Sequence, residues 1–159
     1  MGMDTVIISI ISIALIITVA YSFAMETNTL VNSIHSGFFN FQKTMINKLH
    51  TDIRIGNITW NSTGYKFLKV NVENIGDTKL SDYQLWDVVV VKNNTTMYLS
   101  YGTDWSVVRI YGDFVNPNIL DPMEIAQIEI REQFEKGENI ILKIVTPNGV
   151  VTTQKYVVG

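Results

Sequence analysis

The chain has no cysteine, only two histidines and only three prolines among its 159 residues. Without cysteine it can form neither a disulfide bond nor a thiolate metal site, and redox chemistry does not reveal its compartment. Both histidines, His35 and His50, precede residue 51, so no histidine-rich metal site is expected. The sequence also lacks the Gly-x-Ser-x-Gly, phosphate-loop and dinucleotide-binding motifs. We therefore predict no enzyme, no catalytic residue, no metal and no cofactor.

Charge is missing from one long segment. No charged side chain occurs from Thr5 to Met25, between Asp4 and Glu26, and most of these residues are aliphatic. As a helix the segment would be about 30 Å long, which is the thickness of a bilayer core. No Lys or Arg precedes it and it is longer than the apolar region of a secretory signal, so we expect an uncleaved anchor. The buried helix of a pilin-like filament is the alternative.

Basic patches are also absent. Residues 51–159 carry ten Lys and Arg against thirteen Asp and Glu, which gives this part a net charge of −3. Nucleic acids and other polyanions need a clustered positive surface, so they are poor candidates as partners. The balance is that of an ordinary soluble domain.

The helical pattern continues beyond the apolar segment. Residues 26–50 contain no proline, and apolar residues recur at spacings of three or four. These stripe residues are Leu30, Ile34, Phe38, Phe41, Met45 and Leu49. The stripe could pack on the chain's own domain or form a seam with another such helix, and we favour the seam. We predict a transmembrane helix over 1–25, an amphipathic stalk over 26–50 and a separate domain over 51–159.

From Thr51 the hydrophobic period changes from 3.6 to 2, which indicates strands. Polar turns follow at intervals of about ten residues, so the pattern predicts an all-β antiparallel sandwich of the immunoglobulin type. We expect its tryptophans to be core residues, with a sugar-binding platform as the alternative. The expected strands are 53–60, 67–72, 85–91, 98–101, 105–111, 125–130, 140–145 and 150–158.

Four Asn-x-Ser/Thr sequons follow the helix, at Asn57, Asn61, Asn93 and Asn94. Each lies near an expected turn or strand end, so we predict glycosylation of at least one and an extracellular domain. The polar loop over 113–121 does not have the spacing of an EF-hand, so we expect turn chemistry to account for it, with an all-oxygen calcium site as the alternative.

Three short motifs, in this order, resemble the archaellin-like proteins of archaea. Val72-Glu-Asn-Ile-Gly-Asp-Thr78, followed by Asp87-Val-Val-Val90, is similar to the Asn-x-Gly-Ser/Thr turn and next strand of that family. The segment 120–124, Leu-Asp-Pro-Met-Glu, resembles Leu-x-Pro-Gly-Glu, with Met123 where glycine is usual. Val145-Thr-Pro-Asn-Gly-Val150 is similar to the closing hairpin. The long helix followed by a small all-β domain matches the same layout.

This resemblance implies an archaellum accessory protein of the F or G type, which anchors the rotary motor to the S-layer as part of the stator. It implies single-pass anchoring in the cytoplasmic membrane, with the domain in the pseudoperiplasm. The implied partners are the S-layer protein and a sister subunit, in a homo- or hetero-oligomer. An archaellin or adhesive pilin of the filament is the alternative, and the absence of a basic residue before Gly2 weighs against it.

Overall fold

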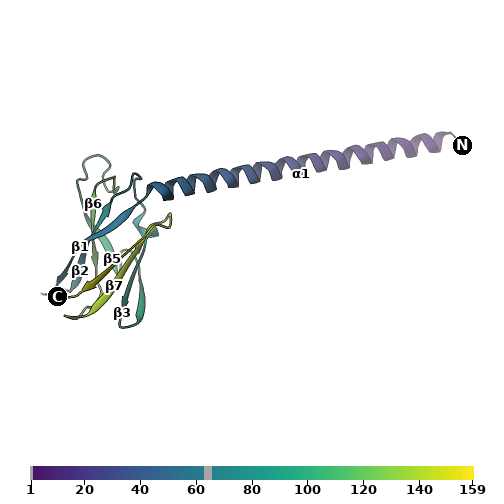
Figure 1. Ribbon diagram of the computed structural model, residues 1–159. Coiled ribbons are helices and arrows are strands. Elements are labelled where there is room, and N and C mark those ends of the chain that lie inside the picture. The colour runs from purple at the N-terminus through teal and green to yellow at the C-terminus, as the bar shows by residue number, and fades with distance from the viewer. Residues whose placement is uncertain (1, 63–65) are drawn as a thin grey trace. The chain divides into compact units, whose positions relative to one another are not determined.

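The computed structural model describes residues 2–62 and 66–159, and it contains one long helix and two four-stranded sheets (Figure 1). The chain divides into two compact units. One is helical and ends at Lys43, and the other is Thr44–Gly159. The last turns of the helix therefore belong with the sandwich unit.

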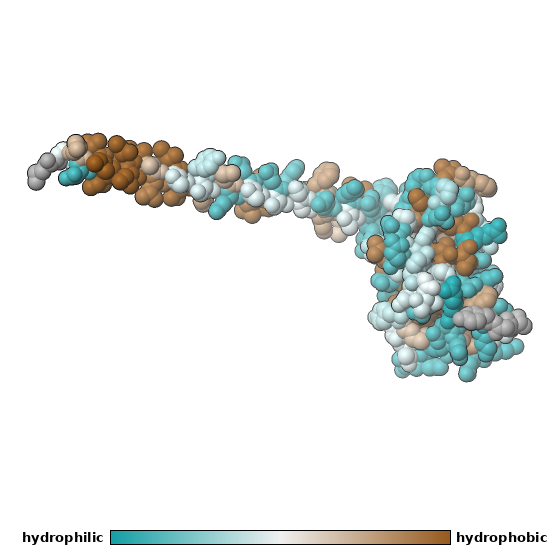
Figure 2. All heavy atoms as spheres, turned by 180° about the vertical axis from the view of Figure 1, so that it is seen from behind, coloured by the Kyte–Doolittle hydropathy of each residue, from teal (hydrophilic) through white to brown (hydrophobic). Residues whose placement is uncertain are grey.

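Helix α1 runs over Met3–His50, which confirms the predicted continuous helix. No residue of α1 is buried within the chain. Its hydroxyl side chains bond back to carbonyls four residues earlier, as in Ser9 to Thr5 and Thr18 to Ala14, both at 2.8 Å. The helix is long and apolar enough to cross a membrane by length and composition. Figure 2 shows its first half as hydrophobic and its second half as mixed.

The domain is the predicted antiparallel sandwich. One sheet has the order β1-β2-β6-β5 and the other has the order β4-β3-β7-β8. Every strand pair is antiparallel, and β1 also contacts β8 across the two sheets. The strands are β1 (Ile53–Asn61), β2 (Phe67–Asn74), β3 (Asp87–Lys92), β4 (Thr95–Leu99), β5 (Trp105–Tyr111), β6 (Ile125–Ile130), β7 (Asn139–Val145) and β8 (Val151–Val157).

The core follows from the alternation of side chains along the strands. In β2, Leu68, Val70 and Val72 are fully buried, while the residues between them are half-buried. Trp105 and Trp86 are also core residues, at 0 % and 4 % exposure, as predicted. Trp60 is half-buried and packs against the same core. Because Trp86 and Trp105 are buried, two of the three tryptophans are not available to form a sugar-binding platform.

Two expected strands differ from the structure. The segment expected over 85–91 begins as a strand only at Asp87, because Tyr83–Leu85 forms a 3₁₀ turn that leaves Leu85 exposed. The strand expected over 98–101 is instead β4, at Thr95–Leu99. Asn93 and Asn94 both have positive φ and form a two-residue hairpin turn, so pairing resumes at once with Thr95.

Candidate functional site: the helix junction and the edge of the sandwich

The chain leaves the helix at Thr51, whose buried hydroxyl joins three segments. Thr51 Oγ1 donates to the Asn47 carbonyl at 2.7 Å and accepts from Asn148 Nδ2 at 2.6 Å. It also lies 2.5 Å from Thr78 Oγ1. A hydroxyl has one hydrogen, so Thr78 must be the donor in that last pair. One side chain thus connects the last helical turns to the loop after β2 and to the β7–β8 turn.

Backbone groups reinforce this connection. The Asp77 amide donates to the His50 carbonyl at 2.8 Å, and the Ile75 and Gly76 amides donate to the Asp52 carbonyl at 3.0 and 3.1 Å. The helix would otherwise end with unpaired carbonyls, and the loop supplies a partner for His50. A Cβ at Gly76 would contact the Asp52 nitrogen and come within 2.6 Å of the His50 oxygen. Only glycine permits so close an approach between backbones.

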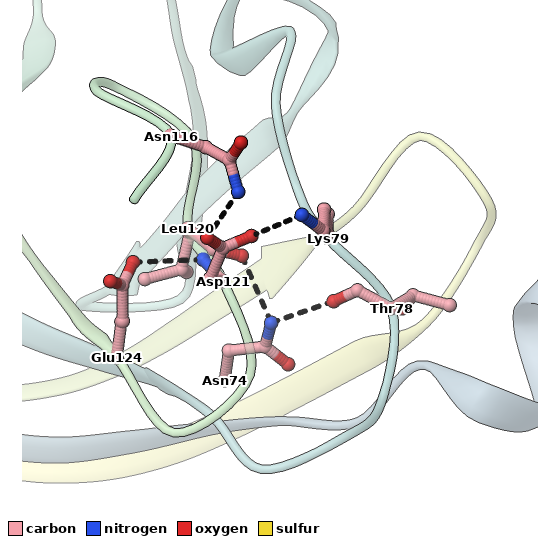
Figure 3. A network of polar contacts seen from close by, with 7 residues as sticks. All are labelled: Asn74, Thr78, Lys79, Asn116, Leu120, Asp121 and Glu124. Atoms are coloured by element: carbon pink, nitrogen blue, oxygen red, sulfur yellow. Dashed lines mark hydrogen bonds and ion pairs between the residues drawn. The ribbon is translucent and has the colours of Figure 1, made fainter. Parts of the chain in front are cut away.

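Asn74 ties the same loop to the segment before β6 (Figure 3). Its side chain is fully buried, and Nδ2 donates to the Thr78 and Leu120 carbonyls at 2.7 and 3.0 Å. Its backbone accepts from Met123 and donates to Glu124. All polar atoms of this buried amide are therefore engaged, since Oδ1 accepts from the Gly76 amide. The three motifs behind the family resemblance thus meet at one end of the sandwich.

The polar loop over 113–121 has the turn role that its composition predicts. Asn116 Nδ2 donates to Asp121 Oδ2 at 2.6 Å, and Lys79 Nζ lies 3.4 Å from Asp121 Oδ1 (Figure 3). Glu124 caps the Asp121 amide at 2.9 Å, and Asp113 accepts from the Asn118 amide. Within residues 2–62 and 66–159, no group of three or more His, Cys, Asp or Glu side chains could hold a metal.

The pKa of Tyr83, a buried residue near this loop, is shifted. Burial raises the pKa of Tyr83 to about 12, and the Asp113 carboxylate adds to the effect. The unfolded side chain would ionise near its ordinary value of 10. The raised pKa therefore leaves stability unchanged below pH 10 and lowers it between pH 10 and 12. At neutral pH Tyr83 is an uncharged core residue.

The sequon asparagines lie in different settings. Asn57 is exposed at an irregularity of β1, between Ile55 and Ile58. Asn61 is half-buried, and its threonine, Thr63, falls outside the described residues. Asn93 and Asn94 are both exposed in the β3–β4 turn, but Asn93 Nδ2 donates to Glu138 Oε1 at 3.0 Å. The structure thus separates four sequons that look alike in sequence.

Exposed apolar side chains occur at the end of β5 and in the connection between β5 and β6. Phe114, Val115 and Met123 are 92 %, 72 % and 91 % exposed, and Tyr111 at the end of β5 is partly exposed. β5 is a sheet edge, so one side of its backbone is open to another strand. Its register shifts between Val107 and Arg109, a bulge of the kind common at edges. We call β5 with these four residues the edge patch.

Sequence reasoning did not identify the edge patch or the role of Thr51. The apolar pair Phe114-Val115 within a polar loop was the available signal for the patch. Met123, at a position where glycine is usual, was a second signal in the sequence. The structure shows why it matters, since its φ of 67° is unusual for a side chain of that size. Thr51 gives no local signal for its contacts with the sandwich, since those two partners, Thr78 and Asn148, lie 27 and 97 residues away.

No family model matches the chain. An uncharacterized protein of Archaeoglobus fulgidus is 27 % identical over 157 residues, or 98 % of this chain and 96 % of that protein. The archaellum periplasmic stator protein FlaG of Sulfolobus acidocaldarius matches with a TM-score of 0.54 and 21 % identity, covering 67 % of this chain and 99 % of FlaG.

Further solved structures match, among them the following two. The FlaF–FlaG stator complex of Sulfolobus acidocaldarius gives a TM-score of 0.53 at 21 % identity, covering 65 % of this chain and 87 % of the other. The flagellin FlaB1 of Methanocaldococcus jannaschii gives 0.52 at 8 % identity, covering 68 % and 90 %. The chain therefore has the fold of archaellum stator proteins and archaeal flagellins, and the predicted archaellin-like resemblance is confirmed.

Proposed function

We propose that the chain is a non-enzymatic, membrane-anchored part of the archaellum stator, which fixes the motor to the S-layer. The likeness to an archaellum periplasmic stator protein supports this proposal. So does a helix that is long and apolar enough to span a bilayer. In this proposal α1 crosses the cytoplasmic membrane once, and the sandwich lies in the pseudoperiplasm.

The junction at Thr51 carries the mechanical part of the proposal. A stator resists torque, so its domain must not turn freely about its anchor. A flexible linker after the helix would allow such rotation. Here the Thr51 hydroxyl and the hydrogen bond from the Asp77 amide to the His50 carbonyl connect the helix end directly to the sandwich, and two further backbone bonds hold Asp52 just after it.

Deleting the gene tests this role. We expect cells that fail to swim, with archaella that are assembled but do not rotate, or with assembly blocked. Electron microscopy of the cell surface and tracking of single cells separate these two phenotypes. Normal swimming in the deletion strain would contradict a stator function, and expression of the intact chain from a plasmid should restore motility.

We further propose that the edge patch binds a sister subunit of the stator. Solved FlaF and FlaG form a complex with each other. An open strand edge offers backbone groups for strand addition, and an adjacent aromatic side chain supplies apolar contact area. Phe114 is the central candidate because it is almost fully exposed in the free chain.

The substitution Phe114→Asp tests the patch. It should reduce co-purification of the partner from detergent-solubilised membranes by at least tenfold, because it places a charge in an apolar contact. Leu85→Asp is the matched control, since Leu85 is an exposed apolar residue outside the patch. Equal recovery of the partner with both variants would exclude the patch as its binding site.

A filament subunit is the second candidate, and the match to flagellin FlaB1 favours it at the level of the fold. In that case α1 would pack among identical helices instead of lipid. The N-terminal mass of the native protein and its abundance in sheared filaments distinguish the two. A shortened N-terminus and high abundance in filaments would identify a filament subunit, whereas an intact N-terminus in the membrane fraction would favour the anchor.

A further inference from the structure

The stripe on the second half of α1 repeats every eleven residues. Leu30, Ile34 and Phe38 are followed by Phe41, Met45 and Leu49 at the same internal spacing. These six side chains are between 44 % and 83 % exposed. Eleven residues make three turns at 3.67 residues per turn, close to the 3.6 of an α-helix. The stripe therefore stays on one face of the helix without a left-handed supercoil.

The same offsets extend back through the apolar half of the helix. Counting back eleven residues from Leu30, Ile34 and Phe38 gives Val19, Phe23 and Thr27. Counting back twenty-two residues gives Ile8, Ser12 and Ile16. Only Ser12 and Thr27 in these triplets are polar. Ser12 Oγ donates to the Ile8 carbonyl at 2.8 Å, and Thr27 Oγ1 donates to the Phe23 carbonyl at 2.7 Å. Their hydrogen atoms are used within the helix, so neither residue makes the face unfit for apolar packing.

The stripe is not flanked by charged residues that would favour pairing with a helix of different sequence. Partner choice between paired helices is set largely by charged residues that flank the seam. From Thr27 to Gln42 the chain contains no Asp, Glu, Lys or Arg. The same helix of a second copy, at the same depth in the same membrane, would run parallel to the first. Each apolar residue of the stripe would then face the same residue of the second copy. At roughly 100 Å² per side chain, six layers would bury about 1,200 Å² in a pair, the lower limit for a stable interface.

We propose that α1 pairs with α1 of a second copy of this chain, parallel and in register, along the eleven-residue face. The parallel orientation rests on the proposed membrane anchor. The pair is straight or slightly right-handed, because an eleven-residue repeat does not produce the left-handed winding of a heptad. Two anchors joined along their length would resist twisting better than one.

Single cysteines test the register directly, because the native chain has none. A heptad seam through Ile34, Phe38, Phe41 and Met45 would continue to Val31 and Lys48, whereas the eleven-residue face continues to Leu30 and Leu49. We expect Leu30→Cys and Leu49→Cys to form disulfide-linked dimers in oxidised native membranes at least fivefold more efficiently than Val31→Cys and Lys48→Cys. Ile34→Cys and Met45→Cys should also cross-link, and Ser36→Cys and Asn47→Cys, two residues further along, should not.

Each contrary result has a distinct meaning. Preferred cross-linking at positions 31 and 48 would overturn the eleven-residue register. A cross-linked product whose mass differs from that of two copies would overturn self-pairing, as would the absence of any product in protein that stays in the membrane after alkaline extraction. Release of the chain by that extraction would instead overturn the anchor on which the parallel orientation rests.

Discussion

At the scale of single residues, Met123 combines backbone strain with exposure. Its φ is 67° and its side chain is 91 % exposed, at the position where the family resemblance predicts glycine. A non-glycine residue in the left-handed region costs about 1–2 kcal/mol. Its exposed side chain offers no packing within the chain to offset that cost. Strain of this kind is often kept where a side chain has a function, which fits a place in the edge patch.

We therefore expect Met123→Gly to raise the free energy of unfolding by about 0.5–1 kcal/mol, since the relieved strain exceeds the added entropy of the unfolded chain. Urea unfolding of the full chain in detergent, followed by tryptophan fluorescence, measures this change because all three tryptophans lie in the sandwich. Asn118→Gly is the control, because Asn118 has a φ of 68° and asparagine tolerates the left-handed region. A loss of stability in Met123→Gly would show that its side chain makes a stabilising contact.

The neighbours Asn93 and Asn94 differ in their availability for glycosylation. The Asn93 amide is held by Glu138, whereas Asn94 is exposed at the tip of the turn with no side-chain bond among the described residues. A glycan attaches through the amide nitrogen, so we expect modification at Asn94. Glycopeptide mass spectrometry should show the glycan lost in Asn94→Gln and retained in Asn93→Gln. The reverse pattern would mean that the hydrogen bond to Glu138 does not protect Asn93.

At the scale of elements, the joint between helix and sandwich depends on the close approach of the Gly76 backbone to the backbone of residues 50–52. We expect Gly76→Ala to lower the free energy of unfolding of the sandwich by about 2–3 kcal/mol, because the new methyl group would push against the backbone of residues 50–52. The control is Gly56→Ala, whose Cβ would mainly meet the carboxylate at the end of the Glu73 side chain instead of backbone atoms. The two variants are compared by the same urea unfolding. Equal stability would mean that the loop moves aside without cost.

The extent of the helix and most of the strands could be predicted from the sequence, because both depend on local periodicity. The stripe and the lack of proline over 26–50 are enough to continue the helix to His50. The strand expected at 98–101 was misplaced because the Asn93-Asn94 turn is shorter than its composition indicates. A two-residue turn with positive φ at both positions is fixed by the pairing of the flanking strands.

At the scale of the whole molecule, the proposed stator function requires a joint that transmits force. We expect insertion of Gly-Ser-Gly-Ser between His50 and Thr51 to reduce swimming speed severalfold while the protein level stays normal, because the helix end would lose its fixed connection to the sandwich. The same insertion between Lys136 and Gly137, in the exposed β6–β7 turn, is the control. Cell tracking and immunoblotting measure the two effects. Unchanged swimming would show that the joint need not be rigid.

The sequence by itself determined the long apolar helix, its striped second half, the sandwich class and the absence of cysteine chemistry. Each of these depends on composition or on neighbours a few residues apart. Only the tertiary structure decided that Asn74 would meet Leu120, that Asn148 would meet Thr51, and that the sequon residue Asn93 would bond to Glu138. These contacts join residues 45 to 97 positions apart. Their geometry depends on how two sheets pack, and no local pattern encodes it.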